Sequence, residues 1–247
     1  TPADVWGEWQ SQMENFGYGI EAEETTVGSD LEVSNITMDI AIPEEDGSVV
    51  VTLPKVTFRD NGDGTVAIVM PATLAMDVAV DSPDGDVDAT VDYNTVGLAM
   101  VVSGSPEEMT YTYSAASMAM SLNQLVVDGE AIDLGTLSME MTNVSGTQTT
   151  SGNMLKTSDG KFGADQLIYT VDVMDPEGSG EYAKMQGNLK DLAFAGTSAT
   201  PKDMDPEDMA KALAQGFAFD GSFSHQGGEF NFDMIADGDA VKGSGTS

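Results

Sequence analysis

Apolar side chains alternate with polar ones through most of this chain, and that alternation restricts the fold more than any other feature. Between about residue 25 and residue 198 the sequence contains runs in which Val, Ile, Leu and Met recur at every second position. Period two places such side chains on one face of a β-strand. Turn sequences such as Asn61-Gly62-Asp63-Gly64 and Asp128-Gly129 separate the runs. Because hairpin turns join antiparallel strands and parallel strands need long crossovers, the pattern predicts an antiparallel meander.

The alternation changes phase in the first part of the meander. Leu31-Val33 follows one phase and Ile36-Met38 the other, with the change at Ser34-Asn35. A slip of this kind predicts a β-bulge. We expect the strands of residues 25–198 to form a curved sheet, a sandwich or a groove, within one mainly β domain that covers residues 1–247.

Residues 1–17 predict an amphipathic helix. Thr1 can cap it, Pro2 suits the first helical position, and Asp4 lies in the first turn, where the helix dipole favours a carboxylate. An apolar stripe at helical spacing holds both tryptophans of the chain: Val5, Trp6, Trp9, Met13 and Phe16. We expect this stripe to close one end of the β-structure. The alternative is that Trp6 and Trp9 dock a partner or contact a membrane interface.

A second, short helix is predicted over residues 206–215, within the segment 205–216. Asp205 is its expected N-cap and Gly216 its end. Residues 217–247 predict a terminal hairpin that turns through Gln226-Gly227-Gly228. The chain then ends without a cap or tail signal, and we expect it to be cut short of a longer protein.

The charge balance excludes whole classes of partner. The chain carries 42 acidic and 9 basic residues, for a formal net charge of −33, and residues 60–155 contain no Lys or Arg. Such a surface repels nucleic-acid phosphate and disfavours landing on anionic lipid headgroups. An apolar fraction of 40% with clear periodicity indicates that this charge lies on a folded surface.

Compartment follows from the same features. Surfaces this acidic suit salty surroundings, where screening weakens self-repulsion. Thr1-Pro2-Ala3-Asp4 resembles a mature terminus left by a signal peptidase. We therefore expect a periplasmic or extracellular protein of a marine or salt-tolerant bacterium, with an acidic cytosolic protein as the alternative. The uncharged run 109–127 is too polar for a transmembrane helix.

Few residues could carry catalysis. The absence of Cys excludes thiol chemistry, disulfides and iron–sulfur clusters, and His225 is the one histidine. His225 adjoins a Gly-Gly turn in a polar stretch, which is typical of a surface residue. Serine-hydrolase, zinc-protease and P-loop motifs are absent. We predict no catalytic residue and no enzyme activity; a hydrolase that uses an Asp or Glu pair is the alternative.

Two acidic turns invite a test for calcium. If Asn61 and Asp63 took the third and fifth positions of an EF-type loop, the first and twelfth would fall on Arg59 and Met70, which cannot supply the carboxylates required. A second cluster holds Asp81, Asp84, Asp86 and Asp88, where weak divalent binding competes with an ordinary solvated turn. We predict hairpin turns at both places, with no metal and no cofactor.

The 16 methionines are the most unusual part of the composition. Methionine is flexible and polarisable, so it suits surfaces that adapt to variable apolar partners. Many lie on alternating positions of the predicted strands, where they could line a groove for acyl chains; a loosely specified core is the alternative. The predicted ligand-binding residues are Met76, Val78, Met100, Met118, Met120 and Met139.

Three segments resemble an uncharacterised family of secreted alphaproteobacterial proteins, domain of unknown function 2125. They are Val5-Trp6-Gly7-Glu8-Trp9-Gln10, Phe58-Arg59-Asp60-Asn61-Gly62-Asp63-Gly64-Thr65-Val66, and residues 97–108. The family in turn resembles the periplasmic AsmA-like proteins. That resemblance implies a curved β-sheet with an apolar groove proposed to carry lipids, and it carries over no functional residue.

Taken together, these features predict a non-catalytic periplasmic β-protein. Its Met-rich sheet face would meet a lipid or another hydrophobic ligand. The alternative is a structural or accessory subunit of a membrane or cell-surface assembly, docked through its first helix or an open sheet edge.

Overall fold

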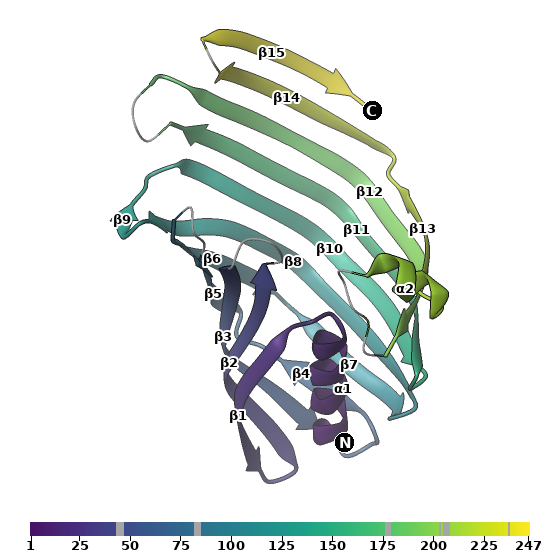
Figure 1. Cartoon of the computed structure of the whole chain (residues 1–247). Coiled ribbons are helices and arrows are strands. Elements are labelled where there is room, and N and C mark those ends of the chain that lie inside the picture. Colours follow the sequence, from purple (N-terminus) through teal and green to yellow (C-terminus); the bar gives the residue numbers. More distant parts are fainter. Residues whose placement is uncertain (43–46, 82–84, 176–178, 203, 205–207, 237) are drawn as a thin grey trace.

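A computed structural model describes residues 1–42, 47–81, 85–175, 179–202, 204, 208–236 and 238–247. It consists of one curved 15-stranded sheet and two helices, α1 (Pro2–Asn15) and α2 (Met209–Ala214) (Figure 1). This architecture confirms the predicted mainly β fold with a first helix and one short second helix.

The strands follow in chain order. They are β1 (Gly19–Val27), β2 (Asp30–Ile42), β3 (Gly47–Asp60), β4 (Val66–Val69), β5 (Thr73–Asp81), β6 (Val87–Val96), β7 (Ala99–Ser105), β8 (Glu108–Val127), β9 (Glu130–Ala131), β10 (Gly135–Ser151), β11 (Leu155–Met174), β12 (Tyr182–Pro201), β13 (Ala218–Ser224), β14 (Gly227–Ala236) and β15 (Asp239–Thr246).

The sheet is an antiparallel meander. Its order is β1-β2-β3-β4-β7-β8-β10-β11-β12-β14-β15, with β5, β6, β9 and β13 beside this path. β4 and β5 lie end to end along β3, and β7 and β6 lie end to end along β8. Since β4 pairs with β7 and β5 with β6, each couple acts as one interrupted strand. If each couple is counted as one strand, every strand along this path pairs with the strands that precede and follow it in the chain.

The predicted terminal hairpin is wrong. β13 pairs with residues 193–199 of β12, and β14 pairs with residues 182–190 of the same strand. The amide of Gln226 donates to the carbonyl of Lys190 at 2.9 Å. Pairing with β12 thus continues through Gln226-Gly227-Gly228, and the chain does not reverse there. Figure 1 shows β13 and β14 as one bent line beside β12; the reversal comes between β14 and β15.

A line of irregularities, which we call the crease, crosses the sheet. It passes through Asn35, Asn143 and Asp191, whose φ angles are 51°, 49° and 50°, and through the breaks between β4 and β5, β6 and β7, and β13 and β14. A left-handed residue within a strand rotates the chain, so one face changes from even to odd positions. The slip predicted at Ser34-Asn35 belongs to this line, and the β1–β2 register shifts beside it.

Helix α1 lies in the hollow of the sheet (Figure 1). It packs on β1, β2 and β3, and its Glu8 pairs with Lys156 of β11. Trp6, 2% exposed, packs on Phe58 with ring centroids 5.8 Å apart. The surrounding core consists of Val5, Leu31, Val33, Ile36, Val56, Val66, Ile68, Val102, Met109 and Tyr111.

The sheet has two faces and two halves, which are named as follows. The face toward α1 is the inner face, and the opposite one is the outer face. The part of the sheet on the α1 side of the crease is the covered half, which includes residues 108–115 of β8 and 144–151 of β10. The part beyond the crease is the open half, which includes residues 118–127 and 135–141 of the same strands.

Both helices begin at a capping side chain. The Thr1 hydroxyl accepts from the amide of Asp4, as predicted, and α1 ends at Asn15, within the predicted range of residues 1–17. In α2 the N-cap is Asp208, whose carboxylate accepts from the amide of Lys211 at 2.8 Å. The predicted cap, Asp205, lies outside the described residues.

Candidate functional site

The inner face of the open half is an apolar surface that neither of the described helices covers. Met118 pairs with Met141 across β8 and β10. Both pack beside a small buried cluster of Ala115, Val144 and Ala164 that lies at the crease. Ala115 continues the alternation of the α1-facing Tyr111, and Met118 packs beside Ala115. The same face therefore continues from the covered half into the open half, and its positions on β8 change from odd to even at the crease.

Residues that pair across neighbouring strands extend this surface across the sheet. One unbroken row crosses eight neighbouring strands: Leu74, Tyr93, Met120, Met139, Tyr169, Gly187, Phe230 and Gly245. At the usual strand spacing it spans about 34 Å. Parallel rows on the same face contain Ile20, Met38, Val51, Val78, Ala89 and Leu125; Leu137, Val171, Met185, Phe232 and Gly243; and Val173, Ala183, Met234 and Val241.

Several large apolar side chains of these rows remain open to solvent. Met120 and Met139 are 36% and 37% exposed, and Phe230 is 43% exposed. At the end of the open half, a cavity of about 590 Å³ is lined mainly by apolar side chains, among them Leu137, Val173 and Val241. An exposed apolar surface of this extent is typical of an interaction site.

The structure brings five of the six predicted ligand-binding residues onto this surface. Met118, Met120 and Met139 lie at its centre. Met76 pairs with Val91, and Val78 lies between Ala89 and Val51. Met100 differs: it lies in the covered half, opposite Tyr113, and packs against the core beneath α1.

The two tryptophans lie in the core beneath α1. Trp6 is buried, and its indole N–H donates to Glu24 at 2.8 Å. Trp9 is partly buried and meets Phe58 edge to face at 5.3 Å. The alternative that Trp6 docks a partner is therefore wrong, because its ring is buried in the packing of α1.

Aromatic rings lie over glycines on the inner face, a feature that the sequence analysis missed. A Cβ at Gly187 would collide with the ring of Tyr169, and one at Gly245 with the ring of Phe230. Gly146 and Tyr113, Gly243 and Phe232, and Gly196 and Phe194 repeat the arrangement. The sequence signal that could have predicted these pairs is a glycine that lies opposite an aromatic residue on the neighbouring strand, or two residues from it on the same strand. These rings therefore lie close to the backbone of the sheet.

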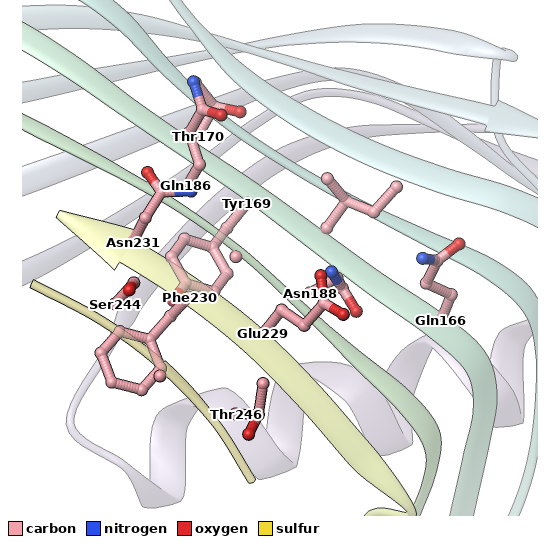
Figure 2. Close-up of a pocket in the computed structure, with 13 residues that line it drawn as sticks. Gln166, Tyr169, Thr170, Gln186, Asn188, Glu229, Phe230, Asn231, Ser244 and Thr246 are labelled. Carbon is pink, nitrogen blue, oxygen red and sulfur yellow. The ribbon is translucent and has the colours of Figure 1, made fainter.

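The outer face of the open half carries a polar pocket of about 560 Å³. Its side chains come from β11, β12, β14 and β15 (Figure 2). One row consists of Thr170, Gln186, Asn231 and Ser244, and a second of Ile168, Asn188, Glu229 and Thr246. Gln186 and Asn188 flank Gly187, over whose inner side the Tyr169 ring lies, so alternation directs them to the outer face.

The predicted turns are held by local hydrogen bonds. Asp63 accepts from the amide and the hydroxyl of Thr65 at 3.0 and 2.6 Å, which holds the pKa of this carboxyl below its ordinary value. Asp60 accepts from the amide of Gly62 at 2.8 Å. Within the described residues there is no cluster of three or more metal-binding side chains; Asp84 lies outside them.

His225 lies at the break between β13 and β14 and is half-buried. Its ring approaches Phe223, with centroids 6.0 Å apart. Its Nδ1 has no hydrogen-bond partner in the part of the chain that the structure describes. Among the residues that the structure describes, no carboxylate bonds to Nδ1 to orient this imidazole as a general base.

None of the described helices is long and apolar enough to cross a membrane. Comparison with protein-family models, with curated proteins and with solved structures gave no match. The resemblance to the secreted alphaproteobacterial family therefore stays a prediction.

Proposed function

We propose that this protein holds a lipid or another elongated hydrophobic ligand on the inner face of its open half. The supporting observation is the row from Leu74 to Gly245, which is apolar across eight strands and lies beyond the reach of α1. Burying such a surface is favourable by about 25 cal/mol per Å². The protein acts by binding rather than catalysis, in a periplasmic or extracellular setting.

The chemistry of this face favours an acyl chain over a protein partner. A protein interface usually carries about one hydrogen bond per 100–200 Å². Within the eight-strand row, the Tyr93 and Tyr169 hydroxyls are the only polar side-chain groups. Dispersion contacts with methionine, which adapts its shape, suit a flexible hydrocarbon chain.

The glycine–aromatic pairs add depth to the surface. Tyr169 and Phe230 lie over Gly187 and Gly245 instead of standing away from the sheet. The rings of Phe230 and Phe232 are nearly parallel, 6.5 Å apart. Rings that lie over the backbone of neighbouring glycines leave room above them for a chain that runs across the strands.

Native mass spectrometry of the protein from its native source, followed by organic extraction, tests the proposal. We expect co-purifying lipid or fatty acid. In titrations with the fluorescent fatty acid cis-parinaric acid, the Met120→Asp/Met139→Asp variant should bind at least ~10-fold more weakly, because both carboxylates would lie in the apolar row.

Ser121→Asp is the matched control, because Ser121 neighbours Met120 on the opposite face. It adds a charge without touching the row, and binding should stay within about twofold of the original protein. An apo mass together with unsaturable parinarate binding would overturn the proposal, as would equal losses in both variants.

The accessory-subunit function has one observation of its own. β15 pairs with β14 on one side, and no described strand pairs with its other side. A free strand edge can accept a strand from another protein. A defined extra protein mass in the native spectrum, without extractable lipid, would favour this second function.

A further inference from the structure

The polar pocket on the outer face differs from the rest of that face in how its side chains are used. Elsewhere, polar neighbours bond to one another: Thr90 donates to Asp77 at 2.9 Å, and Asn123 donates to Asp92 at 2.8 Å. Such cross-strand bonds occupy the hydrogen-bond donors and acceptors of the side chains on this face. They leave little for a ligand.

Inside the pocket these bonds are missing. Among the described residues, no side-chain hydrogen bond involves the pocket's amide and hydroxyl groups, which belong to Gln166, Thr170, Gln186, Asn188, Asn231, Ser244 and Thr246. The Oδ1 atom of Asn188 is buried and has no partner in this part of the chain. A buried polar atom without a partner costs free energy, which a ligand's hydroxyl or N–H would recover.

The pocket is also nearly neutral in a chain of net charge −33. Glu229 supplies its one formal charge, and the lining includes no Lys or Arg. Amide groups offer donors and acceptors side by side. Ile168, 41% exposed, provides an apolar patch between them. Figure 2 shows these side chains spread over four adjacent strands, a layout that fits an extended ligand.

We infer that this pocket binds a neutral polyhydroxylated ligand, of the class of an oligosaccharide. Such a ligand has many hydroxyl groups that both donate and accept, little charge, and apolar C–H faces that can pack on Ile168. A polyanion is excluded by Glu229 and the surrounding acidic surface, since the lining has no cation to offset it. The amide and hydroxyl side chains of the site lie on the opposite face from the apolar row, of which Tyr169, Gly187, Phe230 and Gly245 also line the pocket. Binding there does not depend on the proposed lipid binding.

Saturation-transfer NMR and calorimetry with three neutral trisaccharides, maltotriose, mannotriose and chitotriose, test the inference on the whole chain. We expect saturable binding of at least one of them and none of trigalacturonate, a polyanion of the same length. Asn188→Leu, which keeps the branched shape of the side chain but removes the amide, should weaken binding at least tenfold.

Two control variants separate this site from other effects. Asn123→Leu removes an outer-face amide that is already bonded to Asp92 and should change the affinity less than twofold. Met120→Asp/Met139→Asp should lose parinarate but keep the trisaccharide. The inference is overturned if no trisaccharide saturates, if trigalacturonate binds equally well, or if Asn188→Leu binds like the original protein. Circular dichroism confirms that each variant is folded.

Discussion

Lys156 Nζ lies 2.7 Å from Glu8 Oε2, and this ion pair joins α1 to a strand 148 positions further along the chain. The two side chains are 15% and 8% exposed. Glu8 also accepts from Gln12 at 2.9 Å. The pair therefore fixes the helix against the far flank of the hollow, while Trp6 fixes it against the near flank.

Removing one partner of this pair should be costly. Lys156→Ala leaves a carboxylate in a mostly buried place, and we expect the free energy of unfolding to fall by about 3 kcal/mol. Urea denaturation measures the change. Lys55→Ala, which breaks the exposed pair with Glu32, should cost under ~1 kcal/mol. Equal losses in the two variants would show that the Glu8 pair adds nothing beyond an ordinary surface contact.

The buried phenol of Tyr111 predicts a loss of stability in alkali. Burial raises the pKa of Tyr111, and the charge of Glu8 raises it further. The neutral phenol is thus favoured in the folded state. The contribution of Tyr111 to stability is therefore complete below the pKa of about 10 that a tyrosine has in the unfolded chain, and it declines as the pH rises above that value. In thermal unfolding experiments, the Tyr111→Phe variant should lose less stability than the original protein between about pH 10 and pH 12. Parallel pH profiles for both proteins would argue against this role for Tyr111.

The left-handed backbone of Asn143 predicts that two substitutions differ in their cost. Its φ is 49°, and its amide donates to Asp165 at 2.7 Å. Asn143→Gly accommodates the backbone and should change the free energy of unfolding by less than ~1 kcal/mol. Asn143→Val should lower it by about 2 kcal/mol, because a β-branched residue is strained there. Chemical denaturation of the two variants measures the difference, and an equally stable Val variant would contradict a fixed crease.

The acidic surface predicts a strong response to salt. With a net charge of −33, repulsion opposes the compact state, and screening relieves it over a Debye length that falls to about 3 Å at 1 M. The melting temperature should rise between 0.05 and ~1 M NaCl. Sodium sulfate at equal ionic strength screens charge to the same degree but also strengthens apolar burial, so a comparison of the two salts separates these effects. A melting temperature that stays flat or falls would mean that the carboxylates are already well separated.

Much of the sheet follows from local patterns. Period two and the hairpin turns predict the meander because both are properties of a few adjacent residues, as at Asn61-Gly62. The slip at Ser34-Asn35 is visible because apolar residues lie on both sides of it. The path of Gln226-Gly227-Gly228 was not predictable in this way, since a Gly-rich jog and a Gly-rich turn have the same composition. The bond from Gln226 to Lys190 decides between them.

The candidate sites divide along the same line. Alternation places Met120 and Met139 on one face, so their pairing was within reach of the sequence. The burial of Glu8 was not, because its partner Lys156 is remote in the chain. Neither was the polar pocket, whose rows join residues such as Thr170 and Ser244 that meet only once β11, β12, β14 and β15 are in register.

The meander has a modular consequence. Because each strand position pairs with its neighbours in the chain, the width of the sheet is set by how many hairpins the sequence contains. One hairpin more or fewer would lengthen or shorten the apolar surface by two strand spacings, about 10 Å, and would leave the other pairings as they are. Gene duplication or deletion of a single hairpin thus offers a simple evolutionary route to match the protein to ligands of different length.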